Sequence, residues 1–287
     1  MMSTKFTKMN SQGNDFIIID LAQQKFTEDQ DAIKKICSRD AVGCDQLLLI
    51  NTTDPKRVTC KIYNNDGTSA SQCGNGMRAI MLYLNKKFSI TESIINVCEL
   101  EYKTEVIDKN RISVELGQAS FAENSLPQND IYHQTLRTNP ILSDVFDKLF
   151  YYRADGEEED NILTPELEMV NVGNTHVIVS KKINEKDRNS IVEALDAGFR
   201  ISHYGEVNLT FLLNLCDFIK DPTITLKVKV KEKGAGWTKS CGTGATAAVA
   251  YILHNGYHKA SKYPIKVEQE GGVLEVHWDD SRSLKLV

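Results

Sequence analysis

Two segments of the chain share one pattern: residues 73–84 read CGNGMRAIMLYL and residues 241–253 read CGTGATAAVAYIL. In each segment a Cys-Gly-x-Gly turn precedes a run of small and apolar residues, which predicts a tight turn followed by a buried helix. The two cysteines lie 168 residues apart. A pattern that occurs twice in this way suggests that the chain consists of two related halves.

Two further pairs of motifs occur in the same order. Residues 13–16 (GNDF) are matched by residues 173–176 (GNTH), 160 residues later, and each motif leads into a short apolar run. Residues 45–48 (DQLL) are matched by residues 207–210 (VNLT). The amide residues of these two motifs, Gln46 and Asn208, lie 162 residues apart. Three matched pairs in one order predict an internal duplication.

The predicted elements mix strands with helices. Short β-rich runs bounded by polar residues predict strands at 16–19, 46–50 and 224–230, and residues 225–231 alternate in a way that places one strand face toward solvent. Helices are predicted at 27–39, 76–85, 183–197 and 244–255. We therefore expect an α+β fold of two similar domains related by a pseudo-twofold axis.

The first domain is expected to span residues 1–122 and to carry Cys73, and the second to span 123–287 and to carry Cys241. The last strand is expected to pack back on the first domain. Residues 122–165 are expected to form the boundary region, in which the acidic run at 156–160 predicts a solvated loop.

The composition is that of a globular protein. Hydrophobic residues make up 41% of the 287 residues and charged residues 25%, which excludes disordered classes. The net charge of −5 does not suit nucleic-acid binding, and no apolar run is long enough for a membrane span. Without a signal peptide or a Cys-x-x-Cys pair among the seven cysteines, we expect a cytoplasmic protein with no disulfide framework and no structural zinc.

The two Cys-Gly-x-Gly turns are the predicted site of chemistry. A helix N-terminus offers unpaired N–H groups and a positive dipole end, which bind a carboxylate and lower the pKa of a cysteine placed there. If the halves pack face to face, Cys73 and Cys241 share one cleft. One thiolate then removes a proton from a carbon acid and the opposite thiol delivers a proton to the other face. This scheme inverts a stereocentre and requires no metal and no cofactor.

The residues alone also allow other functions for the two Cys-Gly-x-Gly turns. Glycine-rich turns also bind phosphate, although neither turn carries the Lys-Ser/Thr ending of a P-loop. A thiol redox protein would cycle Cys73 and Cys241 through a disulfide. A non-catalytic protein would bind an amino acid without exchanging its α-hydrogen. Of the other five cysteines, Cys44 is expected to be a packing residue, and the remaining four are expected to be core or inert residues.

The chain resembles the diaminopimelate epimerase family, which interconverts LL- and meso-diaminopimelate without pyridoxal phosphate in lysine and peptidoglycan precursor synthesis. The resemblance covers most of the chain and rests on both cysteine turns and on motifs at 8–9, 13–16, 45–48, 64–67, 173–176, 207–208 and 232–236. It implies two domains, each a β-sheet wrapped around a central helix, with the site between them. It also implies a small amino-acid substrate, no nucleic-acid or membrane partner, and a homodimer.

The resemblance further implies roles for single residues. Cys73 and Cys241 would be the acid–base pair, with His176 and Glu232 assisting one thiol each. The implied substrate-binding residues are Gly74, Asn75, Gly242 and Thr243 at the α-carboxylate, together with Asn14, Gln46, Asn64, Asn174, Asn208 and Lys233.

The chain departs from the family pattern at several positions. Thr175 replaces a proline, Lys233 replaces the arginine that clamps the distal carboxylate, and Trp237 replaces a glutamate. Lysine does not reproduce the bidentate fork of arginine. The alternative functions are therefore racemisation of another amino acid, such as histidine, and amino-acid binding without catalysis.

Overall fold

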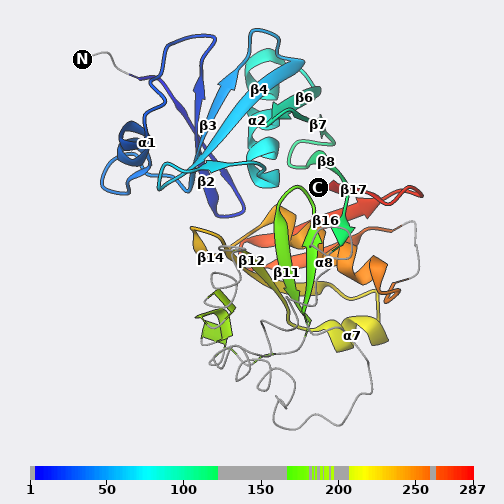
Figure 1. Ribbon diagram of the computed structural model, residues 1–287. Helices are drawn as coiled ribbons and strands as arrows, with labels where there is room; N and C mark the ends of the chain where they lie inside the picture. The colour runs from blue at the N-terminus through cyan, green and yellow to red at the C-terminus, as the bar shows by residue number, and fades with distance from the viewer. Residues whose placement is uncertain are drawn as a thin grey trace.

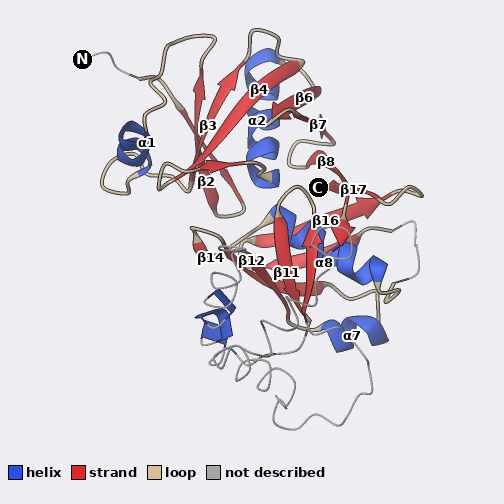
Figure 2. Ribbon diagram, viewed as in Figure 1, coloured by secondary structure: helices blue, strands red, loops and turns tan. Residues whose placement is uncertain are grey.

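The fold is described from a computed structural model, drawn as ribbons in Figures 1 and 2. The structure describes residues 4–121, 167–180, 207–258 and 263–287, and some of the residues between 183 and 196. Strands outnumber helices along this part of the chain, as the red arrows of Figure 2 show, and the strands include parallel and antiparallel pairs. The predicted α+β class is confirmed.

The first half is a curled mixed sheet with one central helix. Strands β2 and β3 pair in parallel, as do β4 and β6, whereas the other neighbours along the sheet are antiparallel. Its elements are β1 (Thr7–Ser11), β2 (Asn14–Asp20), α1 (Gln30–Cys37), β3 (Gln46–Asn51), β4 (Arg57–Asn64), β5 (Ser69–Ala70), α2 (Gly74–Phe88), β6 (Glu92–Val97), β7 (Leu100–Val106), β8 (Ile112–Gln118) and β9 (Ser120–Phe121).

The second half repeats this pattern. Its parallel pairs, β11 with β12 and β13 with β15, occupy the places of the two parallel pairs of the first half. Its elements are β10 (Leu167–Asn171), β11 (Thr175–Val179), β12 (Asn208–Leu212), α7 (Leu215–Lys220), β13 (Leu226–Glu232), β14 (Gly236–Thr238), α8 (Gly242–His254), β15 (Ile265–Gln269), β16 (Gly272–Trp278) and β17 (Ser283–Leu286). The order of strand pairings therefore supports a duplication.

The two halves join along β8 and β17. These strands pair antiparallel, with Leu286 opposite Val114 and Ser283 opposite Gln118, and both lie where the halves meet in Figure 1. The short strand β9 continues into the second half and pairs with β10. Since β8 and β17 are equivalent elements, the pseudo-twofold axis passes through their junction.

Each half packs around its central helix. Every residue of α8 from Gly242 to Ile252 is buried, because strands of the second half contact the helix on all its sides. Helix α2 buries Met77, Ile80, Met81 and Leu84 completely against the first sheet. A helix that is apolar around its whole circumference is stable only when it is enclosed in this way.

The predicted elements are present with shifted ends. Both central helices begin two residues earlier than predicted, at Gly74 and Gly242, because the cysteines themselves cap the helices. In β13 the side chains of Leu226, Val228 and Val230 are buried and the intervening lysines are not, which confirms the predicted alternation.

Two predictions concern segments that are incompletely described. The described residues among 185–196 are helical, in agreement with the predicted helix at 183–197. The predicted boundary loop at 122–165 lies outside the described residues. Among the helices that are described, none has the length and apolar character required to cross a membrane.

Candidate active site

Cys73 and Cys241 hold equivalent positions at the starts of α2 and α8. Each is the N-cap of its helix. The Sγ of Cys73 accepts a hydrogen bond from the N–H of Gly76 at 3.2 Å, and the Sγ of Cys241 accepts one from the N–H of Gly244 at 3.3 Å. A sulfur in this position replaces the usual oxygen of an N-cap residue. The local sequence therefore fixes both thiols at the positive ends of buried helices.

The two helix starts lie against each other. A Cβ atom built on Gly74 would lie 4.0 Å from the Cα of Gly242, and one built on Gly242 would lie 3.6 Å from the backbone N of Asn75. Asn75 also donates from Nδ2 to the carbonyl of Ser240 at 3.1 Å, which ties the first helix start to the residue before Cys241. The two cysteine motifs, far apart in the sequence, thus form one structural unit.

Burial raises the pKa of both thiols. The pKa of Cys73 is raised to about 12 by desolvation, and the charge of Glu232 acts in the same direction, against the hydrogen bond from Gly76. The pKa of Cys241 is raised well above its usual range for the same two reasons. The prediction that the helix N-termini lower these pKa values is wrong here, because desolvation outweighs the helix dipole and the N–H donors.

Glu232 lies at the end of β13, where its carboxyl group interacts with the Cys241 thiol. Thr238 on the adjacent strand β14 donates from Oγ1 to Oε1 of Glu232 at 2.6 Å. Desolvation raises the pKa of Glu232 above its usual value despite these hydrogen bonds. A carboxyl group with a raised pKa beside a thiol is a suitable proton acceptor for that thiol.

His176 is fully buried on β11 and contacts two threonines rather than a thiol. Its Nδ1 lies 2.9 Å from Oγ1 of Thr210 and its Nε2 lies 3.0 Å from Oγ1 of Thr243. Desolvation lowers the pKa of His176 to about 3, so the imidazole is neutral at physiological pH. Thr243 Oγ1 lies 3.4 Å from Sγ of Cys241. Both assisting residues therefore lie on the Cys241 side, which differs from the expected arrangement of one per thiol.

A polar cavity of about 600 Å³ opens beside the cysteine motifs and is lined by both halves. Of the implied substrate-binding residues, it brings together Gln46, Asn64, Asn174, Asn208 and Lys233, with Glu232 at its wall. Several of these side chains hold one another in place. Gln46 donates from Nε2 to Oδ1 of Asn64 at 3.0 Å, and Asn208 accepts the backbone N–H of Lys233 at 3.0 Å.

Four of the implied residues belong to the helix starts. Gly74, Asn75, Gly242 and Thr243 are buried in the first turns of α2 and α8. Asn174 connects the cavity to this unit, since its Nδ2 donates to Oγ1 of Thr243 at 3.1 Å.

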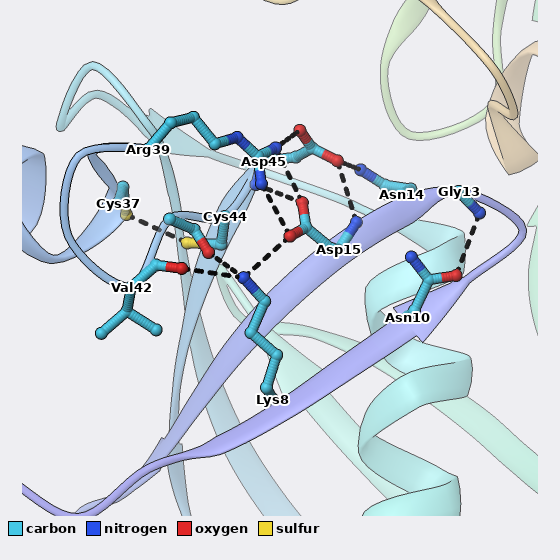
Figure 3. A network of polar contacts seen from close by, with 11 residues as sticks. Lys8, Asn10, Gly13, Asn14, Asp15, Cys37, Arg39, Val42, Cys44 and Asp45 are labelled. Carbon is cyan, nitrogen blue, oxygen red and sulfur yellow. Dashed lines mark hydrogen bonds and ion pairs between the residues drawn. The ribbon is translucent and has the colours of Figure 1, made fainter.

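Asn14 is the one implied residue that belongs to a different network. Figure 3 shows its side chain directed toward Asp45, to which its Nδ2 donates at 3.0 Å, and it is not among the residues that line the cavity. Arg39 bridges Asp15 and Asp45 in the same network, with Lys8 also paired to Asp15. In this conformation Asn14 therefore stabilises the segment that leads into Gln46.

Two departures from the family pattern occupy different surroundings. Lys233 lines the cavity. Trp237 donates from Nε1 to Oδ1 of Asn189 at 2.9 Å and packs against Phe211, and it is not among the cavity-lining residues. Thr175, the third departure, also lines the cavity, so Lys233 and Thr175 are in a position to affect substrate binding and Trp237 is not.

Three further residues belong to this site and are not among those predicted from the sequence. Gln72 is buried directly before Cys73 and lines the cavity, Thr210 contacts His176, and Thr238 contacts Glu232. For Gln72 a signal was present, since it is part of the motif that carries the first cysteine. The two threonines have no motif of their own, and only the pairing of neighbouring strands reveals them.

Comparisons with known proteins identify the family of the chain. Residues 6–122 and 168–286 match the family described as Diaminopimelate epimerase. A Diaminopimelate epimerase of Pelagibacter ubique is 29% identical over 99% of this chain and 95% of the relative. A second, from Blochmanniella pennsylvanica, is 30% identical over 96% of this chain and 91% of the relative.

Solved structures show the same fold at low sequence identity. A "Predicted Epimerase" from Pseudomonas aeruginosa has a TM-score of 0.68 at 14% identity and covers 99% of this chain and 95% of its own. A probable proline racemase from Agrobacterium radiobacter has a TM-score of 0.62 at 11% identity, with coverage of 99% and 89%. The family match spans both cysteine motifs and nearly all of the described strands. The chain belongs to the diaminopimelate epimerase family and is an enzyme of the isomerase class.

Proposed function

We propose that this enzyme interconverts LL- and meso-diaminopimelate through Cys73 and Cys241 as an acid–base pair, as a step in lysine and peptidoglycan precursor synthesis. The observation that supports this most directly is the pair of abutting helix starts, each capped by a cysteine and placed beside one polar cavity. Two such groups on opposite sides of one carbon are what inversion without a cofactor requires.

The proton transfers follow from the pKa directions of the site. Both thiols are protonated in the resting enzyme, because burial raises their pKa values. Glu232 accepts the proton of Cys241, and the resulting thiolate removes the α-proton of the substrate. The Cys73 thiol then gives its proton to the opposite face of the carbon. For the other hand of the substrate the two cysteines exchange roles. At the end of each turnover Glu232 returns its proton to the cysteine left as a thiolate, which is Cys73 in the first direction and Cys241 in the other, and this restores the resting state.

The helix starts supply the electrostatic part of the mechanism. Negative charge develops toward the substrate carboxylate when the α-proton leaves. The N-terminal N–H groups of α2 and α8 are suitable donors for this carboxylate, and they stand in a water-poor environment where such donors are most effective. The residues proposed to bind it are Gly74, Asn75, Gly242 and Thr243.

Solvent-deuterium incorporation at the α-carbon tests the proposal. Purified, reduced enzyme in D₂O should exchange the α-hydrogen of LL- and meso-diaminopimelate with inversion. Cys73→Ala and Cys241→Ala should each abolish inversion, whereas Cys98→Ala, which changes an exposed cysteine, should leave it intact. The proposal fails if either active-site variant keeps near wild-type inversion, or if the folded wild-type enzyme exchanges neither isomer.

One observation favours a second candidate, the same chemistry on another amino acid. Lys233 lines the cavity where the family has an arginine for the distal carboxylate. A single ammonium group holds a carboxylate less specifically than a guanidinium fork. Side-by-side assays with diaminopimelate, histidine and lysine separate the two candidates. A kcat/KM at least about tenfold higher for histidine or lysine would replace the first candidate by the second.

A further inference from the structure

Two buried glutamines lie beside the two reactive cysteines, and they differ in their hydrogen bonding. Gln269 is 6% exposed; its Oε1 accepts the N–H of Cys241 at 2.8 Å and its Nε2 donates to the carbonyl of Cys241 at 3.0 Å. Gln72 is 5% exposed and directly precedes Cys73, yet neither its Oε1 nor its Nε2 has a hydrogen-bond partner within the described residues. The first glutamine is bonded as a structural residue, and the second is not.

A comparison of equivalent positions in the two halves shows the same contrast. Ser240 precedes Cys241 as Gln72 precedes Cys73. The hydroxyl of Ser240 donates to Oε1 of Gln12, in the turn between β1 and β2 of the other half, at 2.9 Å. In the equivalent turn, between β10 and β11, the counterpart of Gln12 is Val172, whose side chain cannot form a hydrogen bond, and Gln72 packs on the neighbouring Gly173. The residue before Cys241 is therefore hydrogen-bonded to the turn between β1 and β2, whereas the amide of Gln72, the residue before Cys73, has no partner among the described residues.

Gly173 also fixes where the amide lies. A Cβ built on Gly173 would lie 2.3 Å from Oε1 and 2.6 Å from Nε2 of Gln72, so the amide packs flat on the glycine backbone. Any other residue would displace it. The amide is thus held at the wall of the polar cavity, which both residues line together with Asn174, whose Oδ1 is likewise unpaired in the described structure.

A buried amide without partners lowers stability, and native proteins rarely keep one unless it has another use. We infer that Gln72 is a substrate-binding residue, whose Oε1 accepts a hydrogen bond from the α-ammonium group and whose Nε2 donates one to the α-carboxylate of the amino acid. This inference rests on the function proposed above. An α-amino acid presents a donor and an acceptor on the reacting carbon, which matches the two free ends of the amide. Gln72 would then orient the Cα–H bond relative to the neighbouring Cys73.

Gln72→Met tests this, because methionine keeps the length of the side chain and removes both polar atoms. The variant should unfold at the wild-type temperature or above it, since the described residues form no hydrogen bond with the Gln72 amide that could be lost. Its kcat/KM for diaminopimelate should fall by at least about tenfold, mainly through KM. Addition of meso-diaminopimelate should raise the unfolding temperature of the wild-type enzyme more than that of the variant.

Gln269→Met is the matched control. It removes an equally buried amide that is fully bonded to the backbone of Cys241, and its unfolding temperature should drop by about 4 °C or more. A drop of that size in Gln72→Met with unchanged kinetic constants would overturn the inference, and so would a kcat/KM within twofold of wild type. If the wild-type enzyme neither exchanges nor binds diaminopimelate, the proposed function fails instead. The unfolding temperatures alone then decide whether the Gln72 amide is bonded within the protein. A lower unfolding temperature in Gln72→Met would show that it is, and would overturn the inference.

Discussion

Thr243 Oγ1 lies 3.0 Å from Nε2 of His176. The same hydroxyl accepts a hydrogen bond from Nδ2 of Asn174 at 3.1 Å and lies 3.4 Å from Sγ of Cys241. One hydroxyl thus connects the buried imidazole, the cavity and a reactive thiol. His176 is connected to Cys241 through this hydroxyl and not by a direct contact, so removal of the hydroxyl group tests whether the connection matters.

Thr243→Val keeps the shape of the side chain and removes the hydroxyl. We expect kcat to fall by about tenfold, because one hydrogen bond that orients the Cys241 thiol is lost. Thr243→Ser keeps the hydroxyl and should stay within about threefold of wild type. Initial rates at saturating substrate measure both. Equal rates for the serine and valine variants would contradict this role of the hydroxyl.

His176 makes the stability of the protein depend on pH. Its pKa is lowered by burial from 6.5 to about 3, so between these values the unfolded chain binds one more proton than the folded protein. The free energy of unfolding should therefore decrease as the pH falls below about 6.5, by up to about 1.4 kcal/mol per pH unit. Urea unfolding between about pH 7.5 and pH 5.5 should show a decrease about 1.4 kcal/mol larger for wild type than for His176→Gln. Parallel curves for the two proteins would contradict it.

The motif pairs predicted the duplicated fold because each pair marks the same place in both halves. Residues 13–16 and 173–176 open β2 and β11, and the cysteine motifs open α2 and α8. The junction of β8 with β17 has no such local signal. It pairs Val114 with Leu286 across most of the chain, and neither segment carries a motif. Long-range strand pairing depends on how whole sheets close, which a short window of sequence does not contain.

The structural positions of the two cysteines were easier to predict than the electrostatics around them. The two cysteines could be located from sequence because the Cys-Gly-x-Gly turns are local features. The direction of their pKa shifts was predicted wrongly, since the helix dipole is visible in a motif and burial by distant strands is not. The network of Asn14 with Asp45 was not foreseen for the same reason, as it depends on a contact between the start of β2 and the residue before β3.

Glu232 should have opposite effects on thiol reactivity and on turnover. Its negative charge raises the pKa of Cys73 and Cys241. Glu232→Gln removes this charge, so Cys73 should be alkylated by iodoacetamide faster near pH 8 than in wild type. Epimerisation should nevertheless slow by at least about tenfold, because the proton acceptor for Cys241 is lost. Peptide mass spectrometry over time measures alkylation, with Glu105→Gln as an exposed control. Slower alkylation of Cys73 in Glu232→Gln would contradict the electrostatic argument.

Lys233→Arg should strengthen binding of diaminopimelate. The residue lines the cavity, and a guanidinium group offers two parallel N–H donors to a carboxylate where lysine offers a point charge. We expect KM for diaminopimelate to fall by about threefold to tenfold with kcat little changed. Lys227→Arg, an exposed lysine beside Glu268, is the matched control. An increased KM in Lys233→Arg would indicate that the lysine is adapted to a different distal group.

The contact between the two helix starts should be sensitive to a single methyl group. A Cβ on Gly242 would lie 2.6 Å from Cδ2 of Leu286 and 3.1 Å from Oδ1 of Asn75, whereas a Cβ on Gly74 would lie 3.0 Å from the same methyl group of Leu286. Gly242→Ala should therefore destabilise the protein by about 1–3 kcal/mol, and more than Gly74→Ala does.

Leu286→Val shortens the side chain and removes the Cδ2 methyl group that the new Cβ would meet. If the clash with Leu286 causes the loss, the double variant Gly242→Ala/Leu286→Val should be less destabilised than the sum of the two single changes, as urea unfolding would show. Strict additivity would place the strain elsewhere. The remaining candidate is then Asn75, whose Oδ1 accepts a hydrogen bond from Arg78 at 2.7 Å and whose Nδ2 holds the carbonyl of Ser240. Displacement of Asn75 would separate the two cysteine motifs. In that case Gly242→Ala should lower kcat by a larger factor than its loss in free energy of unfolding accounts for.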